Sequence, residues 1–474
     1  MTALLAAAPI LLAFAVLLLG RPATWAAAAG LAAAVLVAVL AFPAPLPALT
    51  ASAADYAPLV VEVLLILLFG MALARLLEAS GAMAILSTGL RAVSTSRAGG
   101  TALLVFGVVP FAESVTGYGI GVTVGVPALV HLGHSVPRAA LLGLLGLIAV
   151  PWGALGPGTA VAASLAGLGL DELGVATALV NVIPVLVAVV AVSILCGART
   201  DLRVAVPQAV GGLVLFAGVL GANLLFGTPP AGILGSLAVI AVLLGWARLR
   251  GAAAPRVPHM LRAALPYLVL TAGVLGAQLL AGLRAAWWTE LLASPPVWLA
   301  LACAVAVPAA PGPVDGPAVL VRAARAWVPV GAATGLFMVL GWLMTTTGMS
   351  TAIGSALAVL GAAPGPVLLA LGGILTGSNT GANAMFAGTV AALAETTGGS
   401  TLGLVALGNA AGAFANIATP PRVALAVQIG AGDAPRDDAA RAALARDTAW
   451  VLRRALLCVL AATVPFAAAA AVIG

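Results

Sequence analysis

The feature that most constrains this chain is its succession of long apolar runs, which charged residues interrupt only at short links. Of the 474 residues, 63% are hydrophobic and 7% are charged, which is too little charge to cover the surface of a soluble protein of this size. Because one crossing of a bilayer takes about 20 helical residues, the runs accommodate about 12 spans. We therefore predict an all-α polytopic membrane protein.

The charges indicate which partners to expect. All 20 basic residues are arginines, and such an excess is typical of cytoplasmic loops that face anionic lipid. We expect a lipid bilayer as the surroundings and no nucleic acid as a partner. The first 20 residues lack a positively charged start, so we interpret them as a retained span. The three cysteines have no metal-ligand spacing, and we expect no cofactor or metal.

The positive-inside rule gives a predicted order of units. The predicted units are N-terminal scaffold helices at 1–56, a first repeat at 57–206, connecting scaffold helices at 207–320 and a second repeat at 321–474. A Pro-rich external loop is predicted at 43–58. Short surface helices are predicted at 81–93 and 350–360, one in each repeat.

A polar segment, Glu113-Ser114-Val115-Thr116-Gly117-Tyr118-Gly119, interrupts the apolar run at 101–130. A single crossing would place Arg138 outside, whereas a re-entrant hairpin that turns at this segment keeps the arginines on both flanks inside. The charge pattern favours the hairpin. The next run, 138–170, contains two prolines and three glycines within 151–159, and we predict a helix that is broken there.

The second half repeats this order, with a hairpin at 366–395 that turns at Gly377-Ser378-Asn379-Thr380-Gly381-Ala382-Asn383 and a helix at 401–430 that breaks at 416–422. Gly117 matches Gly381, and Gly153 matches Ile417, at the same offset of 264 residues (381 − 117 and 417 − 153). Charge places the mouths of the hairpins on opposite sides of the membrane. We therefore predict inverted-topology repeats with a substrate site between discontinuous helices.

We predict that both polar segments contribute to one site for a small hydroxylated anion. Helix N-termini offer partial positive charge to a carboxylate, and neutral side chains add hydrogen bonds without a fixed charge that would trap the substrate. The candidate substrate-binding residues are Ser114, Thr116, Gly117, Tyr118, Gly377, Ser378, Asn379, Thr380, Asn383, Thr419 and Arg422. Two interpretations of Arg422 stay open: a countercharge for the substrate, or the cytoplasmic end of the broken helix.

Two acidic residues lie within predicted membrane segments and are candidates for proton coupling. An ionisable group at the bilayer centre costs about 3 kcal/mol or more and is functional by default, which makes Glu113 the candidate proton carrier. The alternative for Glu113 is a structural role, with its carboxylate bonded to N–H groups of the hairpin. Glu62 is the second candidate, although pairing with a structural partner is the favoured interpretation.

At these residues the sequence resembles the lactate permease family of bacterial transporters. Residues 111–119 look like the family's Leu-Glu-Gly-Ala-Ala-Gly-Phe-Gly hairpin segment. Residues 375–386 are similar to its Leu-Thr-Gly-Ser-(Asp/Asn)-Thr-x-x-Asn-Ala-Leu-Phe segment, which is the more specific of the two. The resemblance covers most of the chain from Glu62 onward. The sequence departs from the family where Thr419-Pro420-Pro421-Arg422 replaces a Ser-Pro-Gln-type break.

The resemblance implies a multi-pass protein of the bacterial inner membrane that imports lactate, glycolate or similar 2-hydroxy monocarboxylates by proton symport. It also implies an elevator mechanism, in which paired hairpins move in a transport domain against a scaffold. A sodium-coupled or otherwise selective organic-anion carrier stays open, because related carriers of larger carboxylates have Ser-Asn-Thr at hairpin tips. We expect a transporter and not an enzyme, and a homodimer is an open alternative for the oligomeric state.

Overall fold

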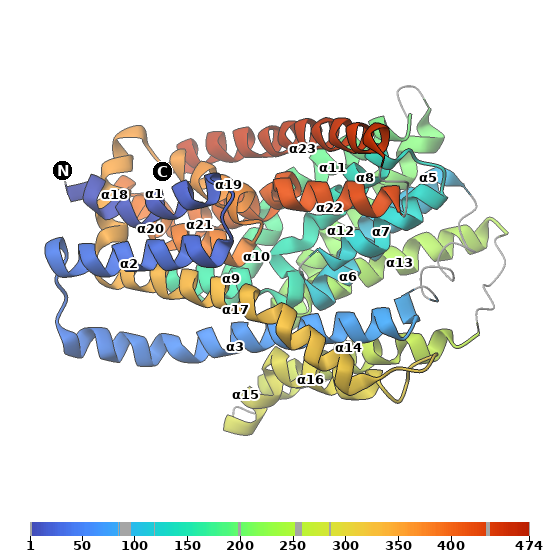
Figure 1. Ribbon diagram of the computed structural model, residues 1–474, viewed down its shortest axis with the longest axis horizontal. Helices are drawn as coiled ribbons and strands as arrows, with labels where there is room; N and C mark the ends of the chain where they lie inside the picture. The colour runs from blue at the N-terminus through green and yellow to red at the C-terminus, as the bar shows by residue number, and fades with distance from the viewer. Residues whose placement is uncertain are drawn as a thin grey trace.

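The computed structural model describes residues 2–83, 85, 96–117, 119–197, 201–251, 258–283, 286–432 and 437–473. Within these residues the chain is helical throughout and contains no strand (Figure 1). By length and composition, eleven helical segments of the described chain can cross a membrane, or twelve if the bent pair of helices Trp287–Ala293 and Pro295–Ala306 forms one span. The prediction of an all-α polytopic membrane protein with about 12 spans is thereby confirmed.

The helices of the first half are α1 (Thr2–Leu18), α2 (Ala23–Ala41), α3 (Leu46–Ala79), α5 (Arg97–Ala102), the π-helix η1 (Leu103–Val108), α6 (Val109–Thr116), α7 (Ile120–His131), α8 (Val136–Leu145), the 3-10 segment η2 (Gly146–Leu155), α9 (Pro157–Ala166), α10 (Leu170–Val180), α11 (Val182–Leu195) and α12 (Leu202–Phe226). Those of the second half are α13 (Ala231–Leu249), α14 (Met260–Leu283), α15 (Trp287–Ala293), α16 (Pro295–Ala306), α17 (Gly316–Thr346), α18 (Met349–Leu357), η3 (Ala358–Leu360), α19 (Pro364–Thr376), α20 (Asn379–Thr397), α21 (Thr401–Ala415), η4 (Asn416–Ala418), α22 (Pro420–Ala431) and α23 (Asp438–Ile473).

The predicted external loop at 43–58 is wrong for most of its length, because α3 already begins at Leu46. Pro47 lies in the first helical turn, where a missing N–H has no intrahelical partner to lose. Pro58 lies inside the helix, which continues through it. The Pro-rich composition therefore marks the start of a long helix.

The sequence predicts three further spans that begin at Pro207, Trp327 and Ala449. Their helices begin earlier, at Leu202 for α12, Gly316 for α17 and Asp438 for α23. Two of these starts have an aspartate N-cap: Asp201 accepts a hydrogen bond from the Arg203 N–H, and Asp315 accepts one from the Ala318 N–H. The predicted unit boundaries at 56/57, 206/207 and 320/321 consequently fall inside α3, α12 and α17.

The chain from α5 to α7 forms a helical hairpin whose two ends are tied together. Arg97 Nη2 donates to the Gly133 carbonyl at 2.6 Å and lies 3.1 Å from His134 Nδ1, while Thr101 Oγ1 lies 2.8 Å from His134 Nε2. Burial and the nearby Arg97 and Arg138 lower the pKa of His134 to about 4, so the ring is neutral at pH 7 and accepts from Arg97. Both ends of this hairpin therefore lie at one end of the molecule.

The second helical hairpin consists of α19 and α20. Its first arm ends at Gly377 with φ +63°, just as the first arm of the earlier hairpin ends at Gly117 with φ +72°. Glycine adopts this left-handed backbone without the steric cost of a Cβ, which explains the residue at both tips. The first arms of the two hairpins thus end at an offset of 260 residues (377 − 117), whereas the predicted match of Gly117 to Gly381 has an offset of 264.

Both predicted helix breaks are confirmed. In the first, α8 passes through η2 into α9, with left-handed backbone at Ala154, Leu155 and Gly156. In the second, α21 passes through η4 into α22, and Thr419 is extended with ψ 121°. Neither conformation continues an α-helix.

The two hairpins approach the centre from opposite ends of the molecule. Figure 1 shows α5 and α7 toward one end and α18 and α20 toward the other. The packing is reciprocal: α7 lies against α22, and α20 lies against α9, so each hairpin contacts the second part of the other half's broken helix. The short surface helix predicted at 350–360 is confirmed as α18 and η3, while the one predicted at 81–93 lies largely outside the described residues.

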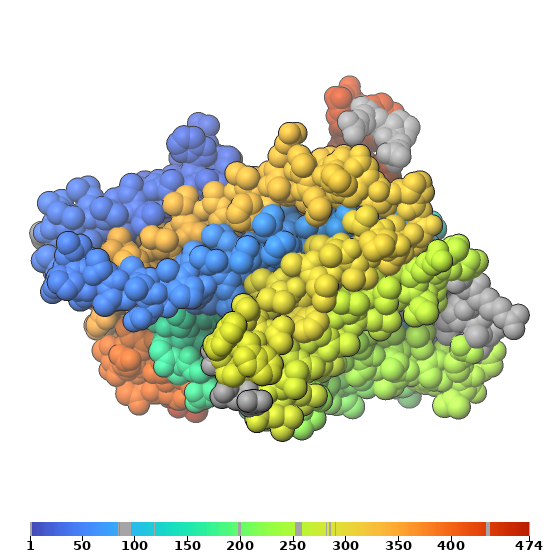
Figure 2. Space-filling model, turned by 90° about the horizontal axis from the view of Figure 1, so that it is seen from below, coloured from blue at the N-terminus to red at the C-terminus, as the bar shows by residue number. Residues whose placement is uncertain are grey.

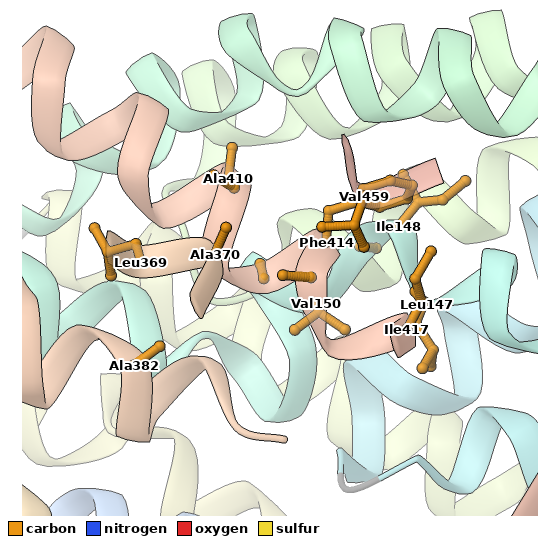
Figure 3. Packing of buried hydrophobic residues seen from close by; sticks show 14 of the residues in the cluster. Leu147, Ile148, Val150, Leu369, Ala370, Ala382, Ala410, Phe414, Ile417 and Val459 are labelled. Carbon is orange, nitrogen blue, oxygen red and sulfur yellow. The ribbon is translucent and has the colours of Figure 1, made fainter. Parts of the chain in front are cut away.

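One hydrophobic core contains residues from both helix breaks. Figure 3 shows Ile148 and Val150 of η2 in one buried cluster with Phe414 of α21 and Ile417 of η4. Figure 2 shows a different face of the molecule, on which α3 runs beside α17 with α14 and α16 next to them. The central hairpins and broken helices are thus covered on this side by long helices.

Gly341 of α17 allows a close approach to α20. A Cβ at Gly341 would collide with the Ala384 carbonyl, whereas one at Gly335 on the same helix would have no heavy atom nearer than 3.7 Å. We expect Gly341→Ala to lower stability by about 1 to 3 kcal/mol through overpacking, and Gly335→Ala to have little effect. Melting temperatures of the purified variants in detergent measure this, and equal melting of both variants would contradict the packing described.

Candidate functional site

A cavity of about 50 Å³ lies where both hairpin tips meet both helix breaks. Since one water needs about 10 to 15 Å³, the space suits a few waters or a small organic molecule. It is lined by Leu67, Glu113, Gly117, Val150, Gly153, Ala154, Pro157, Gly158, Gly377, Ser378, Asn379, Thr380, Asn416 and Arg422. The two polar segments singled out in the sequence thus meet at one place.

Glu113 lies on the last turn of α6 and is 3% exposed. Its carboxylate oxygens accept hydrogen bonds from the Gly119 N–H, at 3.1 Å to Oε1 and 2.9 Å to Oε2. Gly119 is the N-cap of α7, so the carboxylate lies at a helix N-terminus, where partial positive charge favours an anion. The hydrogen bonds that a structural role of Glu113 requires are therefore present. Glu113 also lines the cavity.

Arg422 connects the two hairpin tips. Its Nη2 donates to the Gly377 carbonyl at 2.9 Å, and its Cζ lies 3.8 Å from the position of a Cβ at Gly119. It is also close enough to Glu113 for a favourable Coulombic interaction. Arg422 is the third residue of α22 and lies at the cavity end of that helix, opposite the end at Ala431.

The second tip brings the start of α20 against the start of α9. Ser378 is the N-cap of α20 and accepts from the Gly381 N–H at 3.2 Å. Gly158 permits the contact, because a Cβ there would come within 2.6 Å of Asn379 Nδ2 and 3.0 Å of the Thr380 nitrogen. Two helix N-termini thus face the same cavity, an arrangement that favours a bound anion.

A buried amide network that the sequence did not reveal holds this contact. Asn409 of α21 accepts from Asn379 Nδ2 at 3.0 Å and from Asn383 Nδ2 at 2.8 Å. Its own Nδ2 donates to Thr159 Oγ1 at 3.0 Å and to Thr177 Oγ1 at 3.1 Å. The sequence signal for this network is Asn409 itself, a single asparagine in an apolar run, because a buried amide needs hydrogen-bond partners.

Several candidate residues do not line the cavity. The Ser114 hydroxyl faces Gly232 of α13, Thr116 donates to the Ala112 carbonyl at 2.6 Å, and Thr419 donates to the Gly373 carbonyl at 3.3 Å. Asn383 belongs to the amide network. Tyr118 lies outside the described residues. Of the thirteen candidates, seven line the cavity: Glu113, Gly117, Gly377, Ser378, Asn379, Thr380 and Arg422.

Glu62 lies elsewhere, on the wall of a second cavity of about 580 Å³ between α3, α9 and the α15–α16 pair. Its Oε1 accepts a hydrogen bond from Ser294 Oγ at 3.0 Å. This hydrogen bond is a contact of the kind that structural pairing of Glu62 requires. The two cavities have Pro157 as a common wall residue.

The chemistry of the cavity is that of hydrogen bonding to an anion. Its polar groups are one carboxylate, one guanidinium, amides, hydroxyls and exposed backbone. Within the described ranges, no group of three or more His, Cys, Asp or Glu side chains is placed to hold a metal ion. The site therefore offers means to bind and orient a small charged molecule.

The sequence profile of L-lactate permease matches residues 2–250 and 259–434. The chain belongs to the L-lactate permease family. The resemblance seen at the two hairpins is thereby confirmed and extends over nearly the whole chain. Since this is a family of transporters, the protein is a multi-pass membrane transporter and not an enzyme, and membership implies lactate transport. A search of the curated proteins found no match.

Asn409 should be essential for the contact between the halves. In Asn409→Ala, four hydrogen bonds are lost and buried partners on α9, α10 and α20 are left unpaired, which costs about 1 to 3 kcal/mol for each group that finds no substitute. We expect a large fall in melting temperature and in lactate-induced stabilisation. Asn181→Ala, which removes one 3.4 Å bond to the Ile148 carbonyl, is the control. Equal effects of the two variants would show that the network is unimportant.

Proposed function

We propose that this protein imports lactate and similar small 2-hydroxy monocarboxylates, such as glycolate, across the bacterial inner membrane by proton symport. One observation carries the proposal: Glu113 and Arg422 line one small cavity, together with two helix N-termini, where both hairpin tips meet. Family membership supports the substrate class. The positions of Glu113 and Arg422 on the cavity wall support the coupling of lactate uptake to protons.

The cavity contains one basic and one acidic side chain, so it is close to neutral before the substrate arrives. A substrate carboxylate that binds Arg422 adds a second negative charge beside Glu113. Two such charges about 4 Å apart repel by about 4 kcal/mol at an effective dielectric constant near 20. Protonation of Glu113 removes this repulsion, so the anion and a proton bind together.

The fold supports an alternating-access mechanism of the elevator type. In this proposal the hairpins 101–130 and 366–395 are re-entrant, and the halves 57–206 and 321–474 are inverted repeats. The mouths of the hairpins lie at opposite ends of the molecule, and the packing of α7 on α22 mirrors that of α20 on α9. A substrate between such tips lies near mid-depth, where discontinuous helices supply both donors and acceptors.

Uptake by the purified protein in proteoliposomes tests the transport reaction. We expect labelled lactate to accumulate when the outside is more acidic than the inside, without sodium, and a protonophore to abolish the accumulation. Glycolate should compete with lactate. Accumulation driven by a sodium gradient alone would contradict proton coupling and support a sodium-coupled carrier.

Glu113→Gln tests the proton carrier. Glutamine keeps the shape of a protonated glutamate, and its Oε1 can still accept from the Gly119 N–H, so the site should still bind lactate. We expect gradient-driven accumulation to fall to background while exchange of internal for external lactate continues. Glu62→Gln, outside the cavity, should keep driven accumulation. Driven accumulation by Glu113→Gln at the normal rate would show that another group carries the proton.

A further inference from the structure

We infer that Asn416 recognises the 2-hydroxyl group of the substrate. This inference rests on the proposed function and names the residue within it that selects 2-hydroxy acids. Asn416 begins the 3-10 turn η4 at the second helix break, lines the cavity and is 1% exposed. It belongs to the unwound segment that also leads to Arg422.

The Asn416 amide has unused hydrogen-bonding capacity. Its Oδ1 is fully buried and has no partner among the described residues. The other amide on the cavity wall, Asn379, has a protein partner at both polar atoms, since its Nδ2 donates to Asn409 and its Oδ1 accepts from Asn383. An unpaired buried amide costs about 1 to 3 kcal/mol, so an amide at a cavity wall without a protein partner points to a ligand that supplies one.

The chemistry of a 2-hydroxy acid matches this arrangement. Its carboxylate only accepts hydrogen bonds and suits Arg422 and the helix N-termini, whereas its hydroxyl both donates and accepts, as the amide of Asn416 does. The hydroxyl and the carboxylate are attached to the same carbon atom, so both must bind within one small cavity. Asn416 and Arg422, which line the same cavity, meet this requirement.

A substrate without the hydroxyl leaves the amide unpaired. Propionate differs from lactate only by that group, and a buried site built to bond a hydroxyl discriminates strongly against a ligand that lacks it. In contrast, a site that merely attracts small anions would accept both. The ratio of the two affinities therefore reports on the hydroxyl contact separately from the carboxylate contact.

The test is competition against uptake of labelled lactate in proteoliposomes, with unlabelled lactate or propionate as the competitor. For the unmodified protein we expect propionate to need at least a tenfold higher concentration for half-inhibition. Asn416→Leu has a side chain of similar size without polar groups, and it should bring the ratio close to one. Asn416→Ser, which restores a donor and an acceptor, should give an intermediate ratio. Asn181→Leu, a buried asparagine outside the cavity, should keep the original ratio.

The outcomes distinguish a failure of the inference about Asn416 from a failure of the proposed transport function. An unchanged ratio in Asn416→Leu overturns the inference, as does an unmodified protein that takes up lactate but does not prefer it to propionate. In both cases the transport function stands. Absence of lactate uptake by the unmodified protein overturns both. If Asn416→Leu is inactive, the same ratio is measured for Asn416→Ser, and a ratio equal to that of the unmodified protein then overturns the inference.

Discussion

The structure depends on one constraint: irregular backbone within an apolar, membrane-spanning molecule must find hydrogen-bond partners inside the protein. Two hairpin tips and two helix breaks interrupt the helices, and hydrogen bonds within and between these interruptions satisfy part of their backbone. Arg422 of the second break donates to the Gly377 carbonyl of the second tip, and Thr419 donates to the Gly373 carbonyl one turn earlier. At the first break, Thr159 donates to the Pro151 carbonyl. The cavity exists because these four interruptions meet at one place.

The bonds that join the halves are mostly neutral. Asn409 connects α20 and α21 to α9 and α10 through amide and hydroxyl groups, while Glu113 and Arg422 are the charged side chains on the cavity wall. Neutral networks fix geometry without the desolvation penalty of buried charges. In the proposed mechanism, these few charges respond to the substrate and to a proton, because their surroundings do not titrate with them.

The sequence predicted the large features well because their signals are strong. Prolines and glycines in an apolar run mark helix breaks, and a polar segment within such a run marks a hairpin tip, as at Gly117 and Gly377. The sequence was a poor guide to the directions in which the side chains of the first polar segment point. Glu113 and Gly117 are four residues apart and lie on the same helix face, but Ser114 and Thr116 point elsewhere. Asn409 and Asn416 were missed because nothing local shows which amides become neighbours in space.

The central claim is that both halves of the chain form one substrate cavity, and protection of introduced cysteines tests it most directly. Ser378→Cys and Gly153→Cys place single thiols on opposite halves of the cavity wall, after Cys196, Cys303 and Cys458 are replaced. Gly153 admits a Cβ without a clash, and Ser355→Cys on the exposed side of α18 is the control. We expect lactate to slow maleimide labelling at both cavity positions with the same half-effective concentration and to leave position 355 unaffected. Protection at one cavity position alone, or at neither, would contradict a single shared site.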